Sequence, residues 1–270
     1  MKYALIAGNG RFPILALESA RRLGIEVVAV GIKEEASPGI ESLAARCYWV
    51  SLGELSRLIE ILKQEGITDV IMAGQVKHAQ IFSSIRPDWR LLKLLAALGA
   101  KNTDALIGGV AKILEGEGIQ LVDSTLLLKP MVAGEGPLTR RKPSSEERAD
   151  IAYGRLVASA LADFDIGQSV AICERACVAL EAMEGTDAML HRAASLVNGR
   201  PLRLVKVARR RRLLLFDVPV AGPDTIAAMR ATGTTVLAVD AGRTLLIDRE
   251  EMLAAADEAG IAVVGSKLES

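Results

Sequence analysis

The chain has 270 residues, of which 50% are hydrophobic and 3% aromatic, and its 33 basic residues balance its 33 acidic ones. This length suits one large or two small domains, and the hydrophobic content excludes a disordered chain. Zero net charge and few aromatic side chains argue against a nucleic-acid-binding protein, which needs a basic surface and stacking platforms.

The cysteines and the start of the chain predict a cytoplasmic protein. Cys47, Cys173 and Cys177 form an odd, sparse set without a CxxC motif, which is typical of a reducing compartment. Met1 and Lys2 lead directly into a strand pattern rather than into a secretory leader. No apolar run reaches the roughly 20 residues that span a bilayer.

The first 30 residues predict a βαβ unit. A short apolar run over 3–7 ends in Gly8-Asn9-Gly10-Arg11, a helix is expected over 13–23, and a second strand over 26–30. Such a unit implies a parallel sheet covered by helices. The glycine turn and the helix N-terminus favour an anion, and Gly10 and Arg11 are the candidates for binding it. A tight turn without a ligand is the alternative.

A dinucleotide-binding function fits this unit less well. The sixth position of the GxGxxG fingerprint is Pro13, and the second strand ends at Gly31 where the fingerprint needs an acid. An NAD(P)-dependent oxidoreductase is therefore a disfavoured alternative.

The alternation of helices and strands continues to about residue 125. Helices are expected over 52–65, 88–98 and 104–116, and strands over 68–72 and 119–122. Gly74 and Lys77 follow the strand at 68–72, at the carboxyl end where open α/β sheets bind ligands. His78 is interpreted as an ordinary histidine. We expect a Rossmann-like N-terminal domain over residues 1–132.

Glycines, prolines and bases over 129–143 mark a domain junction, and a mixed α/β domain is expected over 133–270. Ser144 is predicted to cap a helix that reaches about residue 162. Strands over 169–173 and 177–182 read as a hairpin, in which Cys173 and Cys177 face each other across the turn. Plain packing of these cysteines is preferred over metal binding.

Two stretches of this domain carry candidate chemistry. Gly185-Thr186-Asp187 precedes a helix to about 196 and offers free N–H groups for phosphate and an acid for a metal; simple capping by Thr186 is the alternative. Asp217 lies in an apolar run after six basic residues within 203–212. A carboxylate there is costly to bury without a metal, a cation or hydrogen bonds. The stretch predicts either a phosphate site or a strand with a solvated flank.

The remaining elements follow in order. Strands are expected over 204–207, 213–218, 236–239, 244–247 and 261–264, and helices over 223–231 and 249–259.

Several motifs together resemble the UDP-2,3-diacylglucosamine pyrophosphatase family of lipid A biosynthesis, in the form unrelated to metallophosphoesterases. They are LIAGNGRFP (5–13), AGQVKH (73–78), NTDALIGGVA (102–111), GPLTRRKPSSEERADIAYG (136–154), DIGQSVAICERACVALEAMEGTDAML (165–190) and FDVPVAGPDTI (216–226). Their order and spacing, rather than any single motif, carry the resemblance, which covers nearly the whole chain.

The resemblance implies hydrolysis of UDP-2,3-diacylglucosamine to 2,3-diacylglucosamine 1-phosphate (lipid X) and UMP, with a divalent metal, typically Mg²⁺. It implies two domains with the substrate between them, a homodimer, and a cytoplasmic enzyme at the inner membrane surface. Asp217 matches the family's essential acid, as metal ligand or general base. The family's polar residues just ahead of that acid are absent, because Arg212 and Leu213 occupy those positions.

Further substrate-binding residues are expected in both domains. Gly10, Arg11 and Gly74 are assigned to the nucleotide or sugar, Thr186 and Asp187 to the phosphates, and Lys77 and Gln168 are also expected to contact the substrate. The arginines at 209–212 are interpreted as a solvated turn or a membrane-facing patch. Two alternatives remain beside the oxidoreductase: a nucleotide- or phosphosugar-binding module without hydrolysis, and a nucleic-acid binder built on those arginines.

Overall fold

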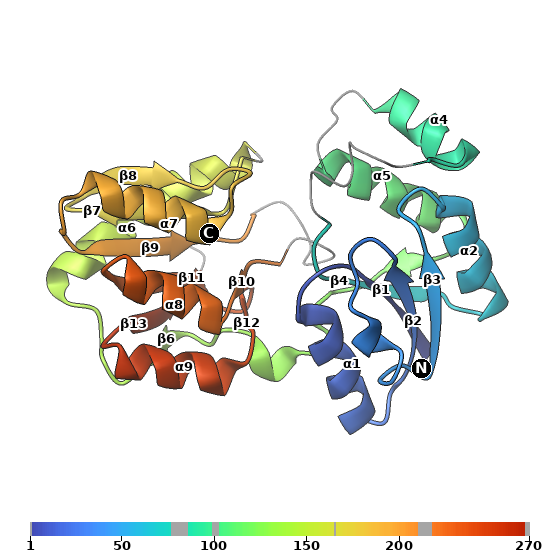
Figure 1. The fold of residues 1–270 in the computed structure, drawn as a ribbon, viewed down its shortest axis with the longest axis horizontal. Coiled ribbons are helices and arrows are strands. Elements are labelled where there is room, and N and C mark those ends of the chain that lie inside the picture. Colours follow the sequence, from blue (N-terminus) through green and yellow to red (C-terminus); the bar gives the residue numbers. More distant parts are fainter. Residues whose placement is uncertain (1, 77–85, 99–102, 165, 210–217, 268–270) are drawn as a thin grey trace. The chain divides into compact units, whose positions relative to one another are not determined.

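The structure, a computed structural model, describes residues 2–76, 86–98, 103–164, 166–209 and 218–267 (Figure 1). The chain folds into two compact units, one comprising the residues up to Leu128 and the other the residues from Lys129 on. Among the described residues, no helix is both long and apolar enough to cross a bilayer.

The N-terminal unit contains an entirely parallel five-stranded sheet in the order β3-β2-β1-β4-β5. The strands are β1 (Lys2–Ala7), β2 (Glu26–Ile32), β3 (Arg46–Val50), β4 (Asp69–Ala73) and β5 (Gln120–Leu121). This strand order is that of a doubly wound sheet, so the predicted Rossmann-like fold is confirmed. Strand β3, an RCYWV stretch that forms one edge of the sheet, was not among the predicted strands.

Helices cover both faces of this sheet (Figure 1). Helices α2 (Leu55–Gln64), α4 (Trp89–Ala97) and α5 (Thr103–Gly116) pack with Ala4, Ile6 and Val28 on one face. Helix α1 (Phe12–Arg22) contacts β2 and β4, and a short 3-10 helix, η1 (Pro38–Ile40), lies against α1. Because side chains alternate along a strand, Leu5 and Ile71 are buried on the other face.

Glu65, just after α2, ties the edge strand β3 to β1. Its carboxylate accepts hydrogen bonds from Lys2 Nζ (2.8 Å), Tyr48 Oη (2.5 Å) and Arg46 Nη1 (2.9 Å). These donors, that of Lys2 foremost, lower the pKa of Glu65 to about 2. The β3 register is therefore held by side chains as well as by the backbone ladder.

The C-terminal unit contains a mixed six-stranded sheet in the order β6-β13-β11-β9-β7-β8. Its strands are β6 (Gly136–Pro137), β7 (Ser169–Cys173), β8 (Ala176–Leu180), β9 (Leu202–Lys206), β11 (Thr234–Asp240) and β13 (Ala262–Ser266). Strands β9, β11 and β13 are parallel, whereas β6, β7 and β8 each pair antiparallel. The predicted mixed α/β domain is confirmed. A second, two-stranded sheet joins β10 (Val220–Ala221) to β12 (Leu245–Leu246).

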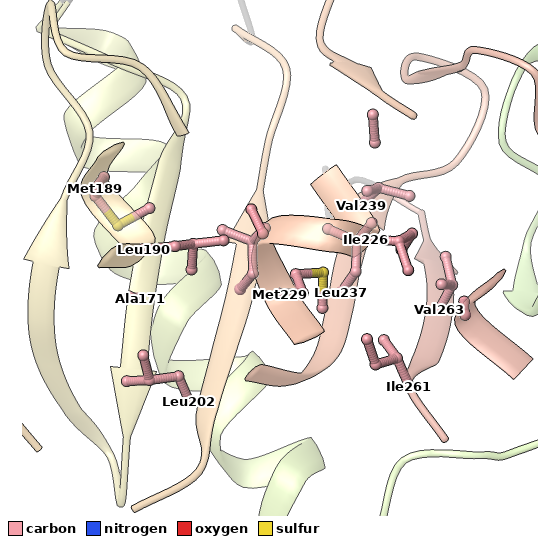
Figure 2. Packing of buried hydrophobic residues seen from close by; sticks show 14 of the residues in the cluster. Ala171, Met189, Leu190, Leu202, Ile226, Met229, Leu237, Val239, Ile261 and Val263 are labelled. Carbon is pink, nitrogen blue, oxygen red and sulfur yellow. The ribbon is translucent and has the colours of Figure 1, made fainter. Parts of the chain in front are cut away.

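Four helices sandwich the mixed sheet (Figure 1). Helices α7 (Thr186–Leu196), α8 (Pro223–Ala231) and α9 (Arg249–Glu258) cover one face, where Met189, Met229 and Leu237 belong to one fully buried cluster (Figure 2). Helix α6 (Ser145–Asp163) covers the other face. A short 3-10 helix, η2 (Lys129–Met131), lies at the start of this unit.

The start of α6 is as predicted. Ser144 Oγ accepts from the Glu147 N–H (3.2 Å) and the Glu147 carboxylate accepts from the Ser144 N–H (2.8 Å), which completes a capping box. Gly154 lets this helix approach the sheet closely, since a Cβ there would lie 2.7 Å from Val205 Cγ2.

The predicted pairing of the two hairpin cysteines is wrong. Cys173 packs with the α7 face of the sheet, whereas Cys177 packs against the α6 side. The turn contains only Glu174 and Arg175, both at positive φ, and Ile172 rather than Cys173 is opposite Cys177. All three cysteines of the chain are free thiols, and burial raises the pKa of each, that of Cys47 to about 11. Cys173 and Cys177 both pack in hydrophobic clusters of the C-terminal unit.

Candidate functional site

The carboxyl ends of β1 and β4 meet at the point where the N-terminal sheet reverses its winding. The Gly8 N–H donates to Ala73 O (2.8 Å), while Asn9 and Gln75 exchange two backbone hydrogen bonds of 2.8 and 3.1 Å. Ligands of open α/β sheets bind at such a switch point. The structure therefore brings the regions of Gly10 and Gly74 together, as the sequence analysis expected.

Glycines are required for this close approach. A Cβ on Gly74, whose φ is +90°, would lie 2.5 Å from Asn9 O, and a Cβ on Gly8 would lie 2.6 Å from Gln75 O. Gly10, with φ of +95°, has no atom within 4 Å of such a Cβ. Gly74 and Gly8 are thus needed for packing, while Gly10 leaves open space next to the first turn of α1.

Arg11 occupies the N-cap position of α1 and is exposed, without a side-chain cap. The first-turn N–H groups of α1 and this guanidinium lie at the same end of the helix, which suits an anion. Lys77, a further candidate of this region, lies outside the described residues, as does His78.

In the C-terminal unit, three strands end or begin at one sheet edge. Ser169 at the start of β7 is paired with Lys206 at the end of β9, and the Glu181 N–H just after β8 donates to Ser169 O (2.9 Å). Helix α7 begins there, at Thr186. Sheet pairing therefore gathers Ser169, Glu181, Thr186 and Lys206 into one group, which we call the Lys206 cluster.

The hydroxyl of Thr186 is the centre of the Lys206 cluster. It accepts from Lys206 Nζ (2.9 Å), donates to Glu181 Oε1 (2.8 Å) and lies 3.3 Å from Ser169 Oγ. The residue that caps α7 is Gly185, with φ of +84° and no side-chain cap. The alternative in which Thr186 is a simple helix cap is therefore wrong.

The electrostatics of the two acids next to this hydroxyl differ. For Glu181 the largest effect is desolvation, which favours the neutral acid, but Lys206 and the Ser169 and Thr186 hydroxyls outweigh it and lower the pKa. For Asp187, desolvation is the largest effect and raises the pKa; Asp224 and Glu181 raise it further, and Lys206 and His191 act in the opposite direction. The pKa of Glu181 is thus lowered by its partners, whereas that of Asp187 is raised, chiefly by burial.

Gln168 lies beside the Lys206 cluster. Its carbonyl accepts from the Val207 N–H (2.9 Å), and its own backbone N–H is among the groups that favour the Glu181 carboxylate. Of the residues predicted for the C-terminal site, the structure thus brings Gln168, Thr186 and Asp187 together. Asp217, the predicted catalytic residue and metal ligand, lies outside the described residues, as do Arg210–Arg212 and most of the predicted strand 213–218.

Described residues on either side of the stretch 210–217 are hydrogen-bonded to other parts of the C-terminal unit. Before this stretch, the Ala208 N–H donates to Asp240 Oδ2 (2.7 Å), and Arg155 Nη2 donates to Asp240 Oδ1 (2.6 Å). After it, the Leu245 N–H donates to Pro219 O (2.9 Å). Asp240 is fully buried at the carboxyl end of β11. Asp240 was not predicted as a site residue. An acid at the end of an apolar run, here TTVLAVD, is nevertheless the same kind of signal that identified Asp217.

The described residues contain no group of three or more His, Cys, Asp or Glu side chains that could hold a metal ion. Magnesium is commonly held by one or two carboxylates together with substrate phosphate oxygens. Asp187 and Asp224, which repel each other and begin two neighbouring helices, fit that smaller donor set.

Comparison with known proteins identifies the family. The model of the LpxI N-terminal domain matches residues 2–140, and that of the LpxI C-terminal domain matches residues 134–264. The chain belongs to the LpxI family. A relative from Caulobacter vibrioides, UDP-2,3-diacylglucosamine pyrophosphatase LpxI, is 33% identical over 274 aligned positions, which cover 98% of this chain and 97% of the relative. The family suggested by the sequence motifs is therefore confirmed.

Two solved structures that match this LpxI-family chain resemble it only distantly. The biotin carboxylase domain of a thermophilic 2-oxoglutarate carboxylase is 10% identical with a TM-score of 0.28, and the match covers 73% of this chain and 32% of that one. UDP-glucose-4-epimerase from Stenotrophomonas maltophila is 16% identical with a TM-score of 0.29, over 60% of this chain and 49% of the epimerase. Matches this weak carry no argument about the site.

Proposed function

We propose that the chain hydrolyses the pyrophosphate bond of UDP-2,3-diacylglucosamine, giving lipid X and UMP for lipid A biosynthesis. The observation that carries the proposal is the relative of that name, which is 33% identical over almost the full length of both chains. Both family domain models match as well, so the chain contains regions similar to both LpxI domains.

The C-terminal unit supplies charged groups suited to a pyrophosphate. Lys206 and the N–H groups at the start of α7 favour phosphate oxygens, and Asp217 follows on the segment that leaves β9. In this proposal Asp217 either orients the attacking water as a base or serves as a metal ligand. Thr186, Asp187 and Gln168 lie next to the phosphates.

A divalent cation, Mg²⁺ in this proposal, would neutralise charge on the phosphate oxygens and the leaving group. Asp217 would hold it, and Asp187 and Asp224 offer further carboxylates whose mutual repulsion a cation would relieve. The chain's own contribution is to keep these acids charged and in place, and to hold the phosphates with Lys206 and the α7 amides.

The glycine junction of the N-terminal unit is proposed to bind the nucleotide or sugar. Gly10 leaves open space beside the first turn of α1, and Arg11 adds a positive charge there. Lys77 follows the same strand end as Gly74 in the sequence. In this proposal both domains contribute to substrate binding, and the enzyme is a homodimer.

The lipid half of the substrate needs apolar contacts. Phe164, Ile166 and Met183 are 78%, 48% and 72% exposed, and they lie on the two segments that flank Gln168 and Glu181. Those segments run side by side, because the position of a Gly167 Cβ falls 2.1 Å from Glu181 O. We propose that this apolar surface contacts lipid, which would place a cytoplasmic enzyme at the inner membrane.

The test is to incubate the purified chain with UDP-2,3-diacylglucosamine and Mg²⁺ and to measure UMP and lipid X. Both products should form in equal amounts, and chelation of the metal should stop their release. Binding of the intact substrate without UMP formation would instead support a nucleotide- or phosphosugar-binding module. UMP release that continues at full rate in excess chelator would contradict the proposed metal dependence.

A further inference from the structure

Lys206 is an unusual residue for its position. It lies at the end of the central strand β9, and the residue is only 8% exposed although it carries an ammonium group. A buried ammonium is costly unless anions and acceptors surround it. Within the described part of the chain, the acceptor of Lys206 Nζ is the Thr186 hydroxyl, at 2.9 Å. An ammonium has three donors, so two remain for acceptors that the described residues do not supply.

Thr186 itself is poorly placed to donate to a phosphate. A hydroxyl has one proton, and that of Thr186 is directed at Glu181 Oε1, 2.8 Å away. Its lone pair accepts the Lys206 proton. Thr186 is therefore a link between a carboxylate and an ammonium group.

We infer that Lys206 is a phosphate-binding residue of the C-terminal unit, and that Glu181 and Thr186 are positioning residues that hold its ammonium group at the N-terminus of α7. This inference rests on the proposed function, because it assigns the pyrophosphate of that substrate to these donors. Two independent features converge on one anion: the charge of the buried Lys206, for which the described residues supply one hydrogen-bond acceptor, and the first-turn amides of an eleven-residue helix. The sequence placed Lys206 in the basic run of 203–212 without distinguishing it from the arginines, and it gave no signal for Glu181.

The rest of β9 provides a matched control. Arg203 is as buried as Lys206, at 7% exposed, but its guanidinium pairs with Asp150 (3.1 Å) towards the opposite end of the strand. The Arg203 guanidinium therefore already has a carboxylate partner. We do not assign it to an anion site at a helix N-terminus among the described residues. Arg203→Met removes a buried charge of the same strand without touching the Lys206 cluster.

The experiment compares Lys206→Met with Arg203→Met, using inorganic pyrophosphate with Mg²⁺ and uridine as ligands in calorimetry and UDP-2,3-diacylglucosamine as substrate. Lys206→Met should lower kcat/KM about 100-fold and pyrophosphate affinity about tenfold or more, because a charged hydrogen bond to phosphate is lost. Uridine affinity should not change. Arg203→Met should keep both pyrophosphate affinity and KM. A folded Lys206→Met protein with wild-type pyrophosphate affinity and kcat/KM would overturn the inference.

A second pair of variants decides the question if Lys206→Met does not fold. Thr186→Val removes the link and should raise KM with about a tenfold loss of pyrophosphate affinity, whereas Thr186→Ser keeps the hydroxyl and should restore both. Wild-type affinity in Thr186→Val would overturn the positioning role. If the wild-type chain releases no UMP, the proposed function fails, while pyrophosphate binding still tests Lys206 by itself.

Discussion

The two candidate regions of this protein are built in opposite ways. The junction of β1 and β4 is made of backbone: glycines pack against carbonyl groups, and two hydrogen bonds join Asn9 to Gln75. The Lys206 cluster is made of side chains, in which a lysine, a threonine and a glutamate hold one another. A backbone site is damaged by adding atoms, and a side-chain site by removing them. That difference allows the contribution of each unit to be tested separately.

The largest effect is expected from Asp217, the proposed catalytic residue of the C-terminal domain. Asp217→Asn should reduce kcat for UMP release by about 1,000-fold or more, because a carboxylate that binds metal or orients water has no amide substitute. Far-UV circular dichroism should remain that of the wild type. Asp163→Asn, at the exposed end of α6, is the control and should be fully active. Full activity in Asp217→Asn would remove the chemistry from this segment.

The backbone region should respond to one added methyl group. Gly74→Ala places a Cβ 2.5 Å from Asn9 O at a φ of +90°, so the N-terminal unit should lose about 2–4 kcal/mol of unfolding free energy. Gly66→Ala is the matched control, since its φ is +65° and no atom lies within 4 Å; it should cost only about 1 kcal/mol.

Urea unfolding monitored by tryptophan fluorescence measures this difference in the N-terminal unit. Both tryptophans of the chain, Trp49 and Trp89, belong to the N-terminal unit. Equal destabilisation by the two alanine variants would mean that the junction of β1 and β4 tolerates a side chain at Gly74.

The exposed apolar side chains of the two units should also differ in how much they contribute to membrane binding. Changing Phe164, Ile166 and Met183 together to Ser should weaken binding to anionic lipid vesicles about tenfold, since each loses apolar surface that a membrane would bury. The control triple variant changes Leu23, Trp89 and Leu92 of the N-terminal unit, which are 61%, 67% and 54% exposed. Vesicle sedimentation reports both. A larger loss in the control variant would move the lipid contact to the N-terminal unit.

The smallest effect concerns Asp187. Because its pKa is raised in the folded state, its negative charge opposes folding at neutral pH, and protonation at lower pH removes that cost. Asp187→Asn should therefore raise the melting temperature by about 1–2 °C at pH 7, with no gain below the pKa of the unfolded acid. Asp187→Glu keeps the charge and serves as the control in calorimetry. A lower melting temperature for Asp187→Asn at pH 7 would contradict the proposed repulsion.

Local patterns predicted most of the fold. The apolar runs predicted β1, β2 and β4, and Ser144 with Glu147 predicted the start of α6. These features were predictable because helix capping and strand periodicity depend on neighbouring residues. Strand β3 was missed because its RCYWV run mixes charged, polar and apolar residues, and its place depends on the long-range contacts of Glu65. The hairpin cysteines were misplaced because a two-residue turn with an irregular register alters which face each residue occupies.

The candidate site was predictable only where the chemistry is local. Gly10, Gly74 and the Gly-Thr-Asp corner were visible because a turn or a helix start requires particular residues. Lys206 was visible only as one of six basic residues over 203–212, and Glu181 was not visible, because their roles depend on Thr186, which lies 20 and 5 residues away in the sequence. The role of Asp240 could not be recognised from the sequence, because its position depends on β11 ending beside the residues that follow β9.

The three free cysteines have a practical consequence. Burial raises the pKa of Cys47, Cys173 and Cys177, so each is mostly the unreactive thiol at neutral pH. A cysteine introduced at an exposed position would therefore react with a maleimide dye well before the native ones. One dye could therefore be attached to each unit without first replacing the native cysteines. Resonance energy transfer between the two dyes would then measure whether substrate binding changes the distance between the units.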